Sequence, residues 1–259
     1  MNRRDFLAAG LAGLAGAASP AKAQDAKEGG QRDYYEFRVY QTHVGSKKDL
    51  LGDFLRDVGI AALNKIGVGP IGVFNVVYGQ NAPSLYVLLV HKSLESVVTA
   101  TQRLLDDKEF QKAAAAHLDA PLSDPQYVRC ESSLMVAFKG MPQLAVPQKK
   151  GRVFELRTYE SHSIKAAMKK IEMFNEGGEI AIFKRTGLSP VFFGQTLIGP
   201  RLPNLTYMLV FDDMADRDNR WAVFGKDPDW AKLRAKEEYK DTVSNITDII
   251  MRPTSYSQI

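Results

Sequence analysis

The sequence is poor in the residues that form disulfides and metal sites. It has one cysteine, Cys130, and four histidines among 259 residues. A single cysteine cannot form an intrachain disulfide, and no cysteine or histidine lies near it at metal-ligand spacing. Cys130 is therefore predicted to be a small, buried apolar side chain, and no metal site is predicted. The chain also lacks a Gly-x-Ser-x-Gly elbow, a phosphate loop and a His-x-x-x-His motif, which are signatures of common hydrolases, nucleotide-binding proteins and metalloproteases.

Long hydrophobic runs are also missing. A membrane-spanning helix needs about 20 strongly apolar residues, and no segment reaches that length. The short run over residues 8–18 follows Arg3-Arg4 and precedes the small-x-small triplet at 21–23. This pattern predicts a signal peptide at 1–23, with a flexible segment at 24–32, and no stable membrane insertion after cleavage.

The paired arginines, with Phe6-Leu7 directly after them, resemble a twin-arginine signal. Such signals are read by a receptor and carry folded bacterial proteins across the inner membrane. An ordinary secretory signal that has two arginines by chance is the alternative. In both cases the expected location is periplasmic or secreted.

The net charge is small. It is +4 for the whole chain, and removal of residues 1–23 takes away three basic residues and one acidic residue, which leaves about +2. A nearly neutral protein gives no reason to expect nucleic-acid binding.

The chain contains a tandem repeat. The octapeptide Glu36–His43 recurs as Glu155–His162, with the shared pattern Glu-x-Arg-x-Tyr-x-(Thr/Ser)-His. After a shift of one residue the match continues, for example Gly67 with Gly187. Each copy is longer than the roughly 20 to 50 residues of a solenoid module. We therefore expect two small domains, at 33–138 and 152–259, with a Pro-containing linker at 139–151.

Each copy shows the same order of predicted elements. In the first copy, alternation, helical periodicity and turn residues predict strands at 34–41, 71–78, 85–90 and 128–138, and helices at 51–62, 94–105 and 109–118. The order βαββαβ is that of a ferredoxin-like domain, so the fold class is α+β. Helices cover only one face of such a sheet. We therefore expect the two sheets to pack face to face, or each to pair with its counterpart in a second chain, and we expect a homo-oligomer.

The chain resembles the NIPSNAP family of the dimeric α+β barrel superfamily. The resemblance lies in the opening strands Tyr35–Tyr40 and Phe154–Tyr159, in the Gly-x-x-Pro that precedes the second strand of each copy, and in the ending Met251–Thr254. It implies a barrel-type arrangement of antiparallel sheets, and it implies no particular chemistry because the family has no agreed activity. The first copy has Glu131–Leu134 in place of the Arg-Pro ending, so any role of that ending falls on the second copy.

The opening strands carry the candidate ligand-binding residues. Strand alternation places Phe37 and Val39 on one face and Glu36, Arg38 and Tyr40 on the other. Because helices need an apolar floor, we expect the Glu-Arg-Tyr triplet to point into the barrel. The same reasoning applies to the second triplet, which consists of Glu155, Arg157 and Tyr159. The favoured interpretation is a structural polar network. The alternative is that Arg38 or Arg157 binds an anionic small molecule through its planar guanidinium.

His43 and His162 recur at the ends of the opening strands. This recurrence makes each a candidate general acid or base, or an axial haem ligand as in some relatives in the superfamily that the chain resembles. The simpler alternative is a solvated turn histidine. His91 and His117 do not recur and are assigned structural roles. The expected function is small-molecule binding or protein interaction through the barrel interior, with no cofactor predicted. The alternative is a cofactor-independent oxygenase or isomerase, or a haem-binding enzyme.

Overall fold

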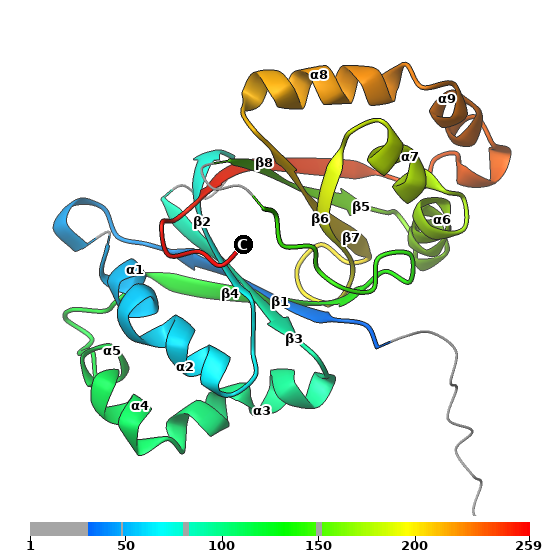
Figure 1. Ribbon diagram of the computed structural model, residues 1–259. Helices are drawn as coiled ribbons and strands as arrows, with labels where there is room; N and C mark the ends of the chain where they lie inside the picture. Colours follow the sequence, from blue (N-terminus) through cyan, green and yellow to red (C-terminus); the bar gives the residue numbers. More distant parts are fainter. Residues whose placement is uncertain (1–30, 48, 80–82, 149–151) are drawn as a thin grey trace, which may run out of the picture.

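The computed structural model describes residues 31–47, 49–79, 83–148 and 152–259, and Figure 1 shows its ribbon. The first half contains β1 (Tyr34–Gln41), η1 (Gly45–Lys47), α1 (Leu50–Phe54), η2 (Leu55–Gly59), α2 (Ile60–Lys65), β2 (Ile71–Tyr78), β3 (Ser84–His91), α3 (Leu94–Leu105), α4 (Lys108–Ala113), α5 (Ala115–Leu118) and β4 (Arg129–Ala137). The second half contains β5 (Val153–Glu160), α6 (Ile164–Asn175), α7 (Glu179–Arg185), β6 (Ser189–Ile198), β7 (Asn204–Phe211), α8 (Met214–Gly225), α9 (Pro228–Arg234), η3 (Glu237–Tyr239) and β8 (Asn245–Pro253). In these described parts, no helix is both long and apolar enough to cross a bilayer.

The eight strands form one closed antiparallel barrel in the order β1-β3-β2-β8-β5-β7-β6-β4. The two halves join where β2 pairs with β8 and β4 pairs with β6. The helices of the two halves lie on opposite sides of the barrel (Figure 1). The predicted α+β class and the tandem ferredoxin-like repeats are confirmed. Since one chain closes the barrel, the barrel needs no second chain, and the expected homo-oligomer stays a prediction.

The repeat extends to the helix starts. Ser93 caps α3 and Asp213 caps α8, each with its side chain accepting a hydrogen bond from a backbone amide of the first turn. Asp107 caps α4 and Asp227 caps α9 in the same way. Such caps satisfy backbone amides that have no partner within the helix, and each contributes about 1 kcal/mol. The two halves therefore begin their outer helices at equivalent positions.

The predicted orientation of the opening strands is wrong. Phe37 packs inside the barrel against residues of both halves, including Leu156 and Ile249. Tyr40 instead packs under the helices of its own half, and Tyr159 does the same in the second half. The interior of an eight-stranded barrel is just wide enough to be filled by side chains. Charged groups there would lie among apolar groups without partners, whereas on the side that faces the helices Glu36 has Ser132 of β4 and Glu155 has Arg217 of α8 as partners.

The segment that follows the last strand crosses to the opposite half. The backbone amide of Val73 donates to Ser257 Oγ at 3.0 Å, and that of Ile71 donates to Gln258 Oε1 at 2.8 Å. Ile259 is 8% exposed and packs in the barrel interior. In the linker, Ala145 donates from its backbone amide to the Val191 carbonyl at 2.9 Å. The segment after each half thus covers the start of the second strand of the other half.

Candidate functional site

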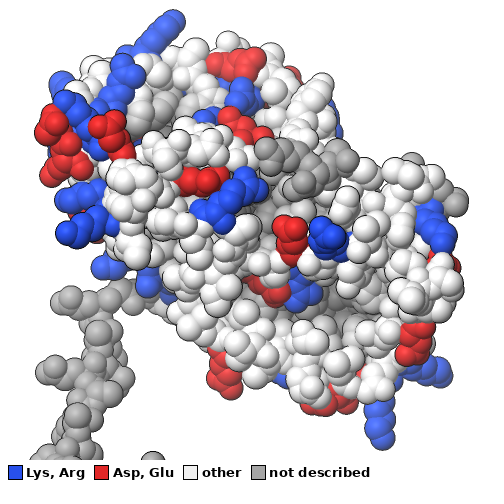
Figure 2. All heavy atoms as spheres, turned by 180° about the vertical axis from the view of Figure 1, so that it is seen from behind, with Lys and Arg blue, Asp and Glu red and all other residues white. Residues whose placement is uncertain are grey.

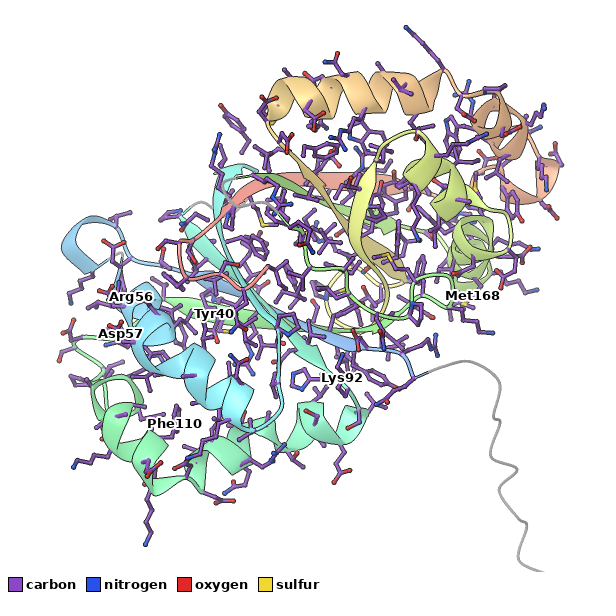
Figure 3. All side chains as sticks on the ribbon, in the orientation of Figure 1. Tyr40, Arg56, Asp57, Lys92, Phe110 and Met168 are labelled. Atoms are coloured by element: carbon purple, nitrogen blue, oxygen red, sulfur yellow. The ribbon has the colours of Figure 1, made fainter. Side chains whose placement is uncertain are left out.

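A cavity of about 210 Å³ lies between the sheet and the helices of the first half. Its deep part is lined by buried side chains, among them Tyr40 from β1, Leu63 from α2 and Phe110 from α4. Its rim carries exposed side chains, including Leu105 of α3 and Leu118 of α5. Figure 3 shows Tyr40 near the sheet and Phe110 in the helix layer. The cavity is therefore mainly apolar and opens between α3 and α5.

Aromatic contacts hold its walls. The rings of Tyr40 and Tyr127 meet edge to face with centroids 5.0 Å apart, and His117 stacks on Phe54 at 3.8 Å with nearly parallel planes. Burial lowers the pKa of His117, so this imidazole is neutral at pH 7. Its Nδ1 is buried and has no hydrogen-bond partner among the described residues. The cavity thus has a neutral histidine in its wall.

The charged residue of the cavity lining is Arg38, and it is held in an ion pair with Glu36. Arg38 donates to Glu36 from Nε at 2.6 Å and from Nη2 at 3.0 Å, and from Nη1 to the Tyr40 hydroxyl at 3.4 Å. Glu36 also accepts from Ser132 Oγ at 3.1 Å, and His91 Nε2 lies 3.6 Å from its other oxygen. Burial alone would raise the pKa of Glu36, but His91, Arg38 and Ser132 together lower it to about 2. Glu36 is therefore ionised and Arg38 is paired.

Tyr40 and Cys130 face each other across β1 and β4. Burial raises the pKa of Tyr40 to about 12, so its hydroxyl keeps its proton at neutral pH. Cys130 is exposed, and the prediction that it is buried is wrong. The first four residues of β4 are all exposed, and Cys130 is one of them.

The second half has bulkier side chains at several of the equivalent positions. The strand registers place Val87 opposite Arg38 and Tyr207 opposite Arg157. Along the helices, the repeat register pairs Gly59, Leu63, Thr101 and Leu104 with Glu179, Phe183, Trp221 and Phe224. Phe183 contacts Phe224 with centroids 4.8 Å apart and Trp221 at 5.9 Å. Aromatic rings fill the space that is open in the first half.

The second triplet is part of this filled core. Glu155 is fully buried and accepts from Arg157 at 3.0 Å, from Arg217 at 2.6 Å and from Trp221 Nε1 at 2.7 Å. The Arg157 guanidinium lies 4.7 Å from the Trp221 ring centroid, a cation–π contact. Glu155 is thus held by three side chains, two of which come from α8.

The two recurring histidines lie apart from the cavity lining. His43 Nε2 contacts the Pro125 carbonyl at 3.0 Å, and His162 is exposed. His117 and Tyr127, to which the sequence assigned no functional role, line the cavity instead. Repetition could not reveal them, because the repeat register places Glu237 opposite His117.

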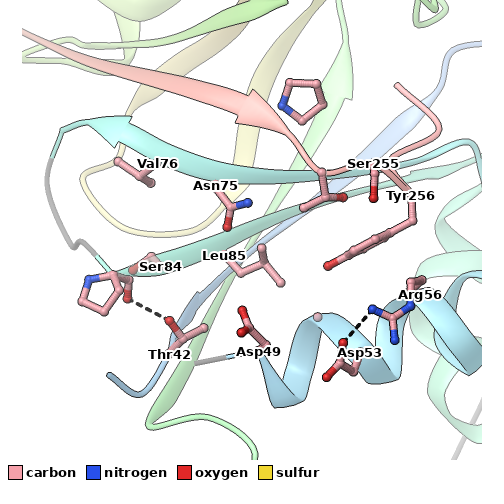
Figure 4. A pocket seen from close by; sticks show the side chains of 14 residues that line it. Thr42, Asp49, Asp53, Arg56, Asn75, Val76, Ser84, Leu85, Ser255 and Tyr256 are labelled. Carbon is pink, nitrogen blue, oxygen red and sulfur yellow. Dashed lines mark hydrogen bonds and ion pairs between the residues drawn. The ribbon is translucent and has the colours of Figure 1, made fainter. Parts of the chain in front are cut away.

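A larger hollow of about 780 Å³ lies between α1, the β2 and β3 strands and the C-terminal segment (Figure 4). Its charged groups include Asp53 and Arg56, which pair with each other at 2.7 Å. On the face shown in Figure 2, basic and acidic side chains lie interspersed. This hollow is the more polar of the two, so we regard the apolar cavity of the first half as the better ligand site.

Comparisons with solved structures agree with the fold. A candidate monooxygenase from Lactobacillus acidophilus matches with a TM-score of 0.53 at 10% identity, over 86% of this chain and 94% of that one. A chlorite dismutase candidate, TA0507, matches with a TM-score of 0.53 at 12% identity, over 87% of this chain and 96% of that one. A NIPSNAP-like domain protein from Burkholderia xenovorans is 22% identical over 42% of this chain and 90% of its own, with a TM-score of 0.38. No curated protein matches.

A scan against protein families matches both halves separately. The NIPSNAP family is found over residues 35–131 and again over 154–258, and each match begins on the opening strand of its half. Together the matches span most of the chain and coincide with the two halves of the barrel. Because the family matches both halves of the chain, the protein belongs to the NIPSNAP family.

Proposed function

We propose that the first half binds a small organic molecule in the cavity between its helices and β1. The observation that carries this proposal is the contrast between the halves. The second half fills the equivalent space with Phe183, Trp221 and Phe224, which stabilises it by burying apolar surface. The first half keeps smaller residues and an open space at a cost in stability. Ligand binding is a physical reason to keep such a cavity.

The size of the cavity limits the ligand. An engineered apolar cavity of about 150 Å³ binds benzene, so a space of about 210 Å³ suits a molecule of one or two fused rings. A haem group does not fit, because sites for drug-sized ligands already occupy about 300 to 1,000 Å³. The histidines expected as axial ligands are also displaced from the cavity lining, since His43 contacts Pro125.

A second candidate function is proton transfer to or from the bound molecule, as a cofactor-independent oxygenase or isomerase requires. His117 favours it, because this residue lines the cavity, is neutral, and has a buried Nδ1 without a partner among the described residues. A neutral imidazole can act as a general base near pH 7. The candidate monooxygenase of similar fold shares only the architecture, so it does not decide between binding and catalysis.

Binding can be tested with 1-naphthol, a two-ring probe. We expect 1-naphthol to raise the melting temperature of the protein in a dose-dependent way. The double variant Leu63→Phe, Leu104→Phe introduces the two phenylalanines of the second half and should abolish the shift. Leu94→Phe is the control, because Leu94 lies on α3, is 45% exposed and does not line the cavity. A shift in melting temperature in the double variant equal to that in the wild type would overturn the proposal.

We further propose that the protein is exported. Residues 1–30, which carry the twin-arginine pattern, lie outside the described residues, so the support is the sequence alone. Replacing Arg3 and Arg4 by lysine should leave the precursor in the cytoplasm of a host with a twin-arginine pathway. Delivery to the periplasm at the wild-type level would contradict this route.

A further inference from the structure

We propose that the cavity selects uncharged ligands, and that Glu36 sets this selectivity by occupying Arg38. This inference rests on the proposed binding function and names the class of ligand: an apolar ring compound with one neutral oxygen group. It argues against the alternative in which Arg38 binds an anion.

The guanidinium of Arg38 is largely used within the protein. Two of its nitrogens, Nε and Nη2, donate to the two oxygens of Glu36 at 2.6 and 3.0 Å. This is the two-pronged geometry in which arginine binds carboxylates most strongly. The third nitrogen, Nη1, lies 3.4 Å from the Tyr40 hydroxyl. An anionic ligand would therefore have to displace Glu36 or share its partner.

Glu36 cannot easily move away. Its side chain is 12% exposed, Ser132 donates to it at 3.1 Å, and His91 Nε2 lies 3.6 Å from it. Displacing it would leave one buried carboxylate without its cation, which is strongly unfavourable. The pair is thus fixed and electrically neutral, and a carboxylate brought against it would be desolvated without gaining a cation of its own.

The groups left for a ligand are neutral. The Tyr40 hydroxyl accepts from Arg38, keeps its own proton, and is also hydrogen-bonded to Cys130, so it adds no charge to the cavity. Tyr127 and Thr101 line the same space, and the remaining walls are mainly leucine and phenylalanine. A phenol or ketone oxygen matches these groups, whereas a carboxylate lacks a free cation.

The test compares 1-naphthol with 1-naphthoate by isothermal titration calorimetry at pH 7, where the first is neutral and the second is an anion. We expect the wild type to bind 1-naphthol at least about tenfold more tightly than 1-naphthoate. In Glu36→Gln, Arg38 gains a free charge, and affinity for 1-naphthoate should rise about tenfold or more while that for 1-naphthol changes little.

Two variants serve as controls. Glu155→Gln makes the same change in the filled half and should leave both affinities unchanged. The double variant Glu36→Gln, Arg38→Met should lose the gained 1-naphthoate binding, because the free cation is removed. If Glu36→Gln fails to fold, the comparison of 1-naphthol with 1-naphthoate on the wild type still tests the selectivity for uncharged ligands.

The outcomes separate this inference from the proposed function. Equal or tighter binding of 1-naphthoate by the wild type would overturn the selectivity and leave the binding function standing. A 1-naphthoate affinity that Glu36→Gln does not raise would also overturn the role of Glu36. Failure of both probes to bind the wild type would overturn the binding function itself.

Discussion

Trp221 and Thr101 occupy equivalent positions in the two repeats. Trp221 belongs to the second half, where aromatic rings fill the space between sheet and helices, and Thr101 belongs to the first half, where this space is a cavity. The indole Nε1 of Trp221 donates to Glu155 on the opening strand at 2.7 Å, whereas Thr101 is exposed at the rim of the cavity. Residues of the filled second half can therefore be introduced into the first half to test whether its cavity binds a ligand.

Thr101→Trp should close the cavity of the first half. The open space can take the indole, so we expect a change in unfolding free energy of less than about 1.5 kcal/mol, smaller than typical overpacking costs. Binding of 1-naphthol should weaken at least about tenfold. Gln102→Trp is the control, because Gln102 is the next residue on α3 and is exposed. Unchanged 1-naphthol affinity in Thr101→Trp would argue against this cavity as the site.

Glu36 should make the unfolding free energy of the protein depend on pH. Its pKa is lowered from 4.5 to about 2 in the folded protein, so the unfolded chain binds the proton more readily. The resulting stabilisation is present above about pH 4.5 and is lost as pH falls toward 2, and it amounts to at most about 3 kcal/mol. Urea unfolding of wild type and Glu36→Gln should show a gap at pH 6 that shrinks steadily below pH 4.5. A constant gap would show that the ionised form of Glu36 is not the stabilising one.

The two arginines of the triplets should differ in their importance for stability. Arg38→Met leaves Glu36 with only Ser132 and His91 nearby, and removal of one partner from a buried pair costs about 3 to 5 kcal/mol. Arg157→Met leaves Glu155 with hydrogen bonds from Arg217 and Trp221, so its cost should be clearly smaller. Chemical denaturation of the two variants gives the comparison, and a larger loss for Arg157→Met would contradict it.

The last residue of the chain should contribute to the stability of the barrel. Ile259 is 8% exposed in the barrel interior, whereas Ile246 on β8 is 45% exposed. Ile259→Ala should therefore lower the unfolding free energy by about 2 to 4 kcal/mol, as truncation of a buried aliphatic side chain does. Ile246→Ala is the matched control and should cost less than about 1 kcal/mol. Similar losses for both variants would mean that Ile259 is not packed as described.

The sequence by itself determined the elements and their repetition. The strand at Tyr34–Gln41 and the helix at Leu94–Leu105 have the bounds that alternation and periodicity predict. These signals are local, because the period of a strand or helix appears directly in the spacing of apolar residues. The recurrence of Glu-x-Arg-x-Tyr also predicted two related halves, since a repeated sequence folds into a repeated structure.

The tertiary structure decided which face of each opening strand is inside the barrel. Alternation separates Phe37 from Glu36, but both faces of this sheet are covered, one by helices and one by the opposite sheet. Which face of the strand offers partners for a charged side chain depends on residues far away in the sequence, such as Arg217 for Glu155 and Ser132 for Glu36. The cavity is also a tertiary property, because it depends on how side chains from β1, α2, α3 and α4 together fill or leave the space between them.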